Sequence, residues 1–211
     1  MTPKPYKTLM TRGAKEFIIN KSRFIGYGAP CETEEEALAF LAEIRQKHKD
    51  ASHNCYAYII GTNMGIMRYS DDGEPSGTAG MPIIEVMKAQ NVTNCAVVVT
   101  RYFGGILLGA GGLVRAYTKG AVLALEASGV GVMHPTKRLL VDVAYPLLNR
   151  FEYMLKSQPV LVEEKTFGES ITFTILVRTA DEPAFSREVI SVSDGRCETL
   201  EMGEFYHPWR E

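Results

Sequence analysis

Long hydrophobic runs and paired cysteines are both missing from this sequence. No apolar stretch among the 211 residues approaches the ~20 residues that a membrane helix requires, and residues 1–10 lack the apolar core of a secretion signal. The four cysteines include no CxxC pair, which argues against a zinc ribbon. Thiols scattered in this way are typical of a reduced protein. We therefore expect a cytoplasmic chain with no membrane partner.

The composition also argues against disorder and fibres. Hydrophobic residues make up 45% of the chain and charged residues 23%, as in an average globular protein. The sequence contains no internal repeat and no low-complexity tract. Its length suits one large domain or two small ones.

Acidic residues are absent between Glu85 and Glu126, although the net charge of the chain is only −2. Lys88, Arg101, Arg115 and Lys119 fall within that window. A segment with positive charge alone produces a local field that favours anions. The alternative is a buried apolar segment with few charges of either sign.

The first part of the chain reads as a mixture of strands and helices. Alternating and β-branched residues predict strands at 7–11, 16–19, 22–29, 54–60, 66–70 and 94–100. Helices are predicted after Thr33, which resembles an N-cap followed by three glutamates, and at 81–90 and 111–128. Gly61-Thr62-Asn63 is a hairpin signal between two of the strands.

The pattern breaks at residues 128–129 and 134–135, so we predict domains at 1–133 and 134–211. In the second domain, strands are expected at 136–143, 160–166, 170–177 and 196–205, and helices at 146–157 and 180–191. The order β-α-β-β-α-β is that of a ferredoxin-like domain. The fold class is therefore α+β in both domains.

The segment from Arg101 to Arg115 holds five glycines in 15 residues, between a predicted buried strand and a helix. Glycines let backbone N–H groups approach a ligand, and free N–H groups at a helix start favour phosphate. Arg115 and Lys119 share a helix face, so they and Arg101 could converge on one phosphate-bearing ligand. The spacing fits neither GxGxxG nor a P-loop. Close helix–sheet packing is the alternative.

Three carboxylates fall within four residues, at Asp71, Asp72 and Glu74. Such a cluster could hold Mg²⁺ or act as acid and base, although its spacing does not fit an EF-hand. Asp-Gly and Pro-Ser-Gly are also ordinary turn sequences, with Ser76 or Thr78 able to cap the next helix. We favour the turn and predict neither a metal site nor a cofactor.

Two further segments carry polar residues on predicted strands. His53 and Cys55 could form a nucleophilic pair but lack a third partner, so we expect Cys55 in the core and His53 as a ligand contact or a structural histidine. Lys21, Arg23 and Tyr27 fall on one strand face, a pattern typical of RNA or phosphate surfaces. Solvated strand charges are the alternative.

Together these segments resemble the IMPACT family, in particular its bacterial, YigZ-like members. The resemblance rests on Lys21-Ser22-Arg23-Phe24, on residues 52–58 and 71–82, and on residues 101–117. It covers nearly the whole chain. It implies an N-terminal α/β sandwich like the second domain of ribosomal protein S5 and a ferredoxin-like C-terminal domain.

The resemblance also implies a role in translation. Eukaryotic members compete for the co-activator of a starvation-responsive kinase, a role that we do not transfer because a bacterium lacks that kinase. We expect a non-enzymatic regulator that binds RNA or the ribosome, or a translation-related protein, through a basic, glycine-rich groove. The alternative is an enzyme, a hydrolase or transferase, acting on a phosphorylated or nucleotide ligand.

The expected binding residues come from all four blocks, and none is expected to be catalytic. They are Lys21, Arg23, His53, Asp71, Asp72, Glu74, Ser76, Thr78, Arg101, Tyr102, Gly104, Gly105, Gly111, Gly112, Arg115 and Lys119. The expectation behind this set is that separate stretches of the first domain fold into one positively charged hollow.

Overall fold

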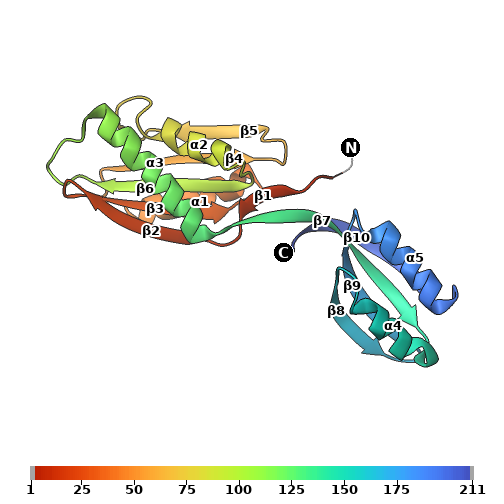
Figure 1. Ribbon diagram of the computed structural model, residues 1–211. Helices are drawn as coiled ribbons and strands as arrows, with labels where there is room; N and C mark the ends of the chain where they lie inside the picture. Colours follow the sequence, from red (N-terminus) through yellow and green to blue (C-terminus); the bar gives the residue numbers. More distant parts are fainter. Residues whose placement is uncertain (1–2, 210–211) are drawn as a thin grey trace. The chain divides into compact units, whose positions relative to one another are not determined.

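The computed structural model describes residues 3–209, which divide into two compact units (Figure 1). The first unit is Tyr6–Val132, and the second contains residues 3–5 and 133–209. Each unit is an α+β structure with its own sheet and its own hydrophobic core. The α+β fold class predicted from the sequence is thus confirmed.

The sheet of the first unit has five antiparallel strands in the order β2-β3-β6-β4-β5. Their bounds are β2 Gly13–Ile19, β3 Ser22–Pro30, β6 Cys95–Tyr102, β4 His53–Ile60 and β5 Ile66–Ser70. The β4–β5 pair confirms the hairpin predicted around residues 61–63. The first predicted strand, β1 (Tyr6–Leu9), lies outside this sheet and contributes Leu9 to the core.

Helices cover both faces of this sheet. The helices α2 (Gly80–Ala89) and α3 (Gly109–Ser128) pack on one face, where Figure 1 shows them side by side, and α1 (Glu34–Lys47) packs on the other. The central strand β6 alternates accordingly, with Val97 and Val99 towards α2 and α3 and with Ala96 and Val98 towards α1. The result is a three-layer sandwich with β6 buried on both faces, as its continuous apolar run predicts.

Local chemistry explains where α1 begins and how closely α3 approaches the sheet. The Thr33 hydroxyl accepts a hydrogen bond from the Glu36 N–H (3.2 Å), which confirms the predicted N-cap. A Cβ added to Gly26 would lie 2.2 Å from the Gly120 carbonyl oxygen. Only glycine at residue 26 therefore lets α3 lie directly on β3.

The second unit has the strand order β10-β7-β9-β8, with neighbouring strands antiparallel. The elements are β7 Val130–Val143, the 3₁₀ turn Tyr145–Leu147, α4 Leu148–Leu155, β8 Val160–Phe167, β9 Ile171–Arg178, α5 Glu182–Ser193 and β10 Glu198–Pro208. Both helices contribute to a core built on residues such as Phe151 and Phe173. This is the βαββαβ arrangement that the sequence predicts.

The strand β7 runs without interruption through residues 134–135, where the sequence pattern breaks, and the two compact units divide between residues 132 and 133. Proline has no N–H to donate, but at residue 135 the strand uses the carbonyl, which accepts from the Thr179 N–H (2.8 Å). Among residues 3–209, no helix is both long and apolar enough to cross a membrane.

Candidate functional site

A cavity of about 490 Å³ lies at the N-terminal end of α3. Its walls come from the start of β4, the loop between β5 and α2, the end of β6, and residues 107–113. The volume falls within the range of roughly 300–1,000 Å³ that is typical of small-molecule sites. The segments that form it are the later blocks of the sequence resemblance.

Three side chains form a row across the sheet beneath the cavity. His53, Arg101 and Phe24 are direct neighbours in the register of β4, β6 and β3, so they point to the same face. The Arg101 side chain is only 6% exposed. Its guanidinium lies between two aromatic rings, 5.5 Å from the centre of Phe24 and 5.3 Å from that of Phe103.

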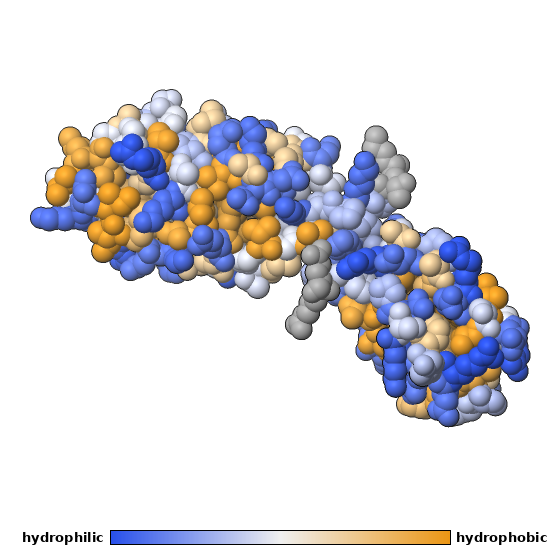
Figure 2. Space-filling model, in the orientation of Figure 1, coloured by the Kyte–Doolittle hydropathy of each residue, from blue (hydrophilic) through white to orange (hydrophobic). Residues whose placement is uncertain are grey.

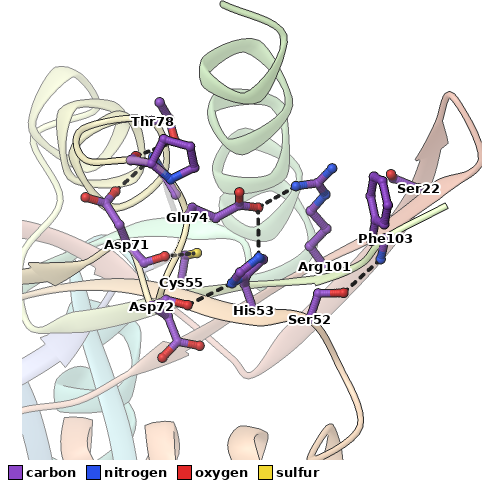
Figure 3. A network of polar contacts seen from close by, with 12 residues as sticks. Ser22, Ser52, His53, Cys55, Asp71, Asp72, Glu74, Thr78, Arg101 and Phe103 are labelled. Carbon is purple, nitrogen blue, oxygen red and sulfur yellow. Dashed lines mark hydrogen bonds and ion pairs between the residues drawn. The ribbon is translucent and has the colours of Figure 1, made fainter. Parts of the chain in front are cut away.

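A carboxylate on the cavity wall neutralises the buried guanidinium. Glu74, 3% exposed, accepts a hydrogen bond at Oε1 from Arg101 Nη1 (2.7 Å; Figure 3). The same oxygen accepts from the Tyr117 hydroxyl (2.7 Å). Burial and the hydrogen bonds to neighbouring groups raise the pKa of Tyr117, which keeps its hydroxyl proton available for Glu74. A buried ion pair is tolerated only when its members are satisfied in this way.

One acceptor atom of this cluster is left for a ligand. Within residues 3–209, Glu74 Oε2 makes no hydrogen bond, and it is not fully enclosed by protein atoms. It therefore keeps contact with solvent. His53 Nδ1 lies 2.8 Å from the Asp72 carbonyl oxygen and must donate to it. Its Nε2 lies 3.9 Å from Glu74 Oε1, a contact that Figure 3 also marks.

The other two acids of the loop bind the backbone instead of the cavity. The Asp71 carboxylate accepts from the N–H groups of Gly77, Ala79 and Gly80 at 2.8–3.0 Å, and Asp72 Oδ2 accepts from the Asn54 N–H at 2.7 Å. Of the three acids expected in one hollow with the basic residues, two therefore have their carboxylates bound to backbone N–H groups. Asp71 shapes the cavity wall, and only Glu74 lines it.

The cap expected from Ser76 or Thr78 is also wrong. Asp71 binds the first amides of α2, whereas the Thr78 hydroxyl donates to the Pro75 carbonyl (2.7 Å) and Ser76 is exposed. Carboxylates cap helix starts as well as hydroxyls do. The sequence did not reveal this cap because Asp71 lies eight to nine residues before the amides that it binds. Across the described ranges, no three His, Cys, Asp or Glu side chains gather as a metal site.

Cys55 is buried in the core beside Ala57 and Ile59, as predicted. Its Sγ lies 2.9 Å from the Asp71 carbonyl oxygen, and burial raises the pKa of the thiol. A thiol with a raised pKa is a poor nucleophile at neutral pH. The Cys–His interpretation therefore has no support from the geometry.

The glycines before α3 serve the backbone in different ways. A Cβ on Gly104 would lie 2.0 Å from the Lys21 backbone, so this glycine lets β6 pass the β2–β3 turn. Gly105 and Gly109 have φ of +81° and +68°, with open space on the Cβ side. At Gly111 and Gly112 the nearest atoms to an added Cβ are Arg115 Nη1 (3.6 Å) and Leu108 Cβ (3.0 Å).

The amides of this segment are only partly occupied. The Phe103 N–H donates to the Ser52 hydroxyl at 3.0 Å (Figure 3). The Gly104 N–H donates to the Ser22 hydroxyl at 3.1 Å. At the start of α3, in contrast, no side chain in the described chain caps the helix and no carbonyl outside it accepts from Gly109, Ala110 or Gly111. The helix start therefore presents free donors to the cavity.

The expected convergence of all the basic residues is wrong. Lys21 lies in the β2–β3 turn, and Arg23 and Tyr102 lie on the α1 face of the sheet, opposite Arg101. Successive strand residues point to opposite faces, so Arg101 and Tyr102 must separate. Lys119 sits over the Phe17 ring (4.8 Å) on the outer part of α3.

The α1 face carries its own polar cluster, centred on His48. The His48 ring nitrogens lie 2.6 Å from the Tyr27 hydroxyl and 2.8 Å from the Tyr102 hydroxyl. Tyr27 was expected on an exposed face, but it is buried because α1 covers it. Burial, and then the charges of Lys47 and Arg23, lower the pKa of His48.

Basic side chains around this cluster lie over tyrosine rings. Arg23 lies 5.5 Å from the Tyr102 ring centre, Arg45 lies 5.4 Å from that of Tyr56, and Lys47 lies 5.0 Å from that of Tyr27. Neither Arg45 nor Lys47 is among the binding residues expected from the sequence. The available signal was the basic composition at the C-terminal end of α1.

Comparison with known proteins places these features in a family. The Impact N-terminal domain matches residues 20–125, and the domain of unknown function DUF1949 matches residues 141–196. The IMPACT family member YvyE of Bacillus subtilis is 39% identical over 196 residues, which cover 93% of this chain and 90% of YvyE.

Two further comparisons agree. The IMPACT family member YigZ of Escherichia coli is 33% identical over 188 residues, which cover 88% of this chain and 92% of YigZ. A solved structure described as that of a hypothetical protein aligns with a TM-score of 0.61 and 30% identity, over 95% of this chain and 98% of that one. With its four sequence blocks in the first unit and its βαββαβ second unit, this chain belongs to the IMPACT family.

Proposed function

We propose that this IMPACT family member is a non-enzymatic regulator of translation that binds single-stranded RNA, either free or on the ribosome. The observation that carries the proposal is the placement of Arg23, Arg45 and Lys47 over tyrosine rings on the α1 face. Basic groups held beside aromatic rings favour RNA, because the cations bind phosphates and the partly exposed rings of Tyr56 and Tyr102 are suited to contact bases.

Charge on this face supports the same proposal. Arg23 and Arg45 are each about half exposed and have carboxylates nearby, at 3.1 Å from Glu16 and 3.5 Å from Asp72. Such exposed ion pairs contribute little free energy, so a phosphate can replace the carboxylate. Lys47 is exposed and has no ion-pair partner within residues 3–209.

The test is single-stranded RNA binding across a salt series, by filter binding and by co-sedimentation with ribosomes. Each phosphate contact contributes about −0.7 to the slope of log K against log salt. Replacing Arg23, Arg45 and Lys47 together with glutamine should reduce the slope by about 2 and weaken binding. The matched control replaces Arg150, Lys156 and Arg187 of the second unit and should change little. Absence of salt-sensitive binding at low ionic strength would refute the proposal.

A further inference from the structure

The cavity at the start of α3 is independent of the proposed RNA surface, because it lies on the opposite face of the sheet. We propose that this cavity binds a small organic phosphate that carries hydroxyl groups and a flat apolar part, a ligand of mononucleotide type. The argument has three parts: an anion subsite, an acceptor for a hydroxyl group, and an apolar wall.

The anion subsite is the first turn of α3. Its free N–H groups carry the positive end of the helix dipole, and the open space beside Gly105 and Gly109 lets a phosphate approach the backbone. Arg115 Nη1 is next to Gly111, and this exposed arginine has no ion-pair partner in the described part of the chain. A helix start together with a guanidinium matches the charge of a phosphate monoester better than that of a carboxylate.

A second, independent observation comes from the buried arginine beneath the cavity. Arg101 is more than nine-tenths buried and lines the cavity, and its Nε is buried without a hydrogen-bond partner. Buried polar atoms are rarely left unsatisfied, and exceptions are found at functional sites. Phe24 and Phe103 thus fix the position of the guanidinium. Among residues 3–209, only Glu74 accepts a hydrogen bond from the guanidinium, and it does so from Nη1.

The acceptor next to it selects for a hydroxyl group. Glu74 Oε2 lines the cavity and makes no hydrogen bond within residues 3–209. This oxygen requires a donor on the ligand, since an acceptor facing another acceptor is unfavourable. A sugar hydroxyl meets that requirement, and inorganic phosphate alone does not exploit it.

The remaining wall of the cavity is apolar and partly exposed. Pro75, Phe103, Leu107, Leu108 and Leu113 line it, with Phe103 48% exposed and Leu107 84% exposed. Figure 2 shows hydrophobic atoms gathered at the end of the first unit where the loop before α3 lies. An exposed ring beside a phosphate subsite is suited to stacking on a base.

The test uses the full chain labelled with ¹⁵N and titrated with adenosine monophosphate, adenosine and inorganic phosphate. We expect adenosine monophosphate to shift the amide signals of residues 109–111 and to bind at least about tenfold more tightly than either part, because both subsites contribute. A trinucleotide with a 5′-phosphate is the fourth probe. Binding of the trinucleotide at those amides assigns the phosphate to an RNA end, and its failure assigns it to a free mononucleotide.

The decisive variant is Ala110→Glu, matched by Ala110→Gln. Residue 110 is exposed in the first turn of α3, so both variants are expected to fold. The added carboxylate competes for the free amides and repels phosphate, so adenosine monophosphate should bind the glutamate variant about tenfold or more weakly than the glutamine variant, which adds the same bulk without the charge. No binding at millimolar concentration, or equal binding by both variants, overturns the proposal. RNA binding on the α1 face is unaffected by either outcome.

Discussion

The two faces of the first unit's sheet use charge in opposite ways. Under α2 and α3, Arg101 and Glu74 are almost fully buried and form an ion pair at the edge of a cavity. On the α1 face, Arg23 and Arg45 are half exposed over tyrosine rings, with loose carboxylate partners. The difference shows that the charge of a sequence segment does not decide its role, because adjacent strand residues enter different environments.

The largest expected effect concerns the buried pair. Glu74→Ala leaves Arg101 charged and buried without its carboxylate, which should lower the free energy of unfolding by about 3–5 kcal/mol. The matched change on the other face, Glu16→Ala, removes an exposed partner of Arg23 and should cost less than about 1 kcal/mol. Urea unfolding measures both, and equal losses would erase the distinction between the faces.

The next effect concerns the loop that forms the cavity wall. Asp71→Ala leaves the three backbone N–H groups without their acceptor and should destabilise the protein by about 1–3 kcal/mol. The control is Asp50→Ala. The Asp50 carboxylate accepts one exposed hydrogen bond within residues 3–209, from the Tyr102 hydroxyl at 3.2 Å. Thermal unfolding should separate the two variants, and similar midpoints would argue against an anchoring role for Asp71.

A smaller, pH-dependent effect belongs to the α1 face. The folded protein lowers the pKa of His48, mainly through burial, so the unfolded chain binds more protons once the pH falls below about 6.5. Stability should therefore decrease on acidification through that range, down to the lowered pKa. Tyr27, Tyr102, Lys47, Arg23 and Asp50 surround the ring.

The measurement is urea unfolding at pH 7.5 and 5.5 for the wild type and His48→Gln. The variant lacks the titrating group, so its loss of stability between the two pH values should be smaller. A loss as large as that of the wild type would assign the effect to other groups.

The smallest effect is a gain. Ala110→Glu places a negative charge beside the free amides of α3 and should stabilise the ligand-free protein by about 0.3–1 kcal/mol relative to Ala110→Gln. Chemical denaturation at low salt measures the difference. A loss of stability would show that these amides already have a partner.

Much of the architecture could be predicted from the sequence. Alternation and continuous apolar runs gave the strands, and Thr33 and the glycine-rich segment marked helix starts. The pattern break at residues 134–135 does not interrupt β7, because a proline whose carbonyl alone pairs is compatible with a strand.

The candidate site was harder to predict. Glu74, Arg101 and His53 were found as polar residues in suggestive segments, but their pairing depends on strand register, which brings residues 53 and 101 side by side. Asp71 lies eight and nine residues before the two amides that it caps, at Ala79 and Gly80. No short sequence pattern predicts a cap over that distance. The separation of Arg23 from Arg101 follows from side-chain alternation and the order of the strands, which a single segment does not reveal.

The central claim is that the two faces bind different ligands. The most direct measurement is a ¹⁵N amide titration of the whole chain with a single-stranded RNA that lacks a terminal phosphate. The account predicts shifts around residues 22–23 and 45–49, on the α1 face, and none at residues 109–111. Shifts confined to the start of α3 would contradict it.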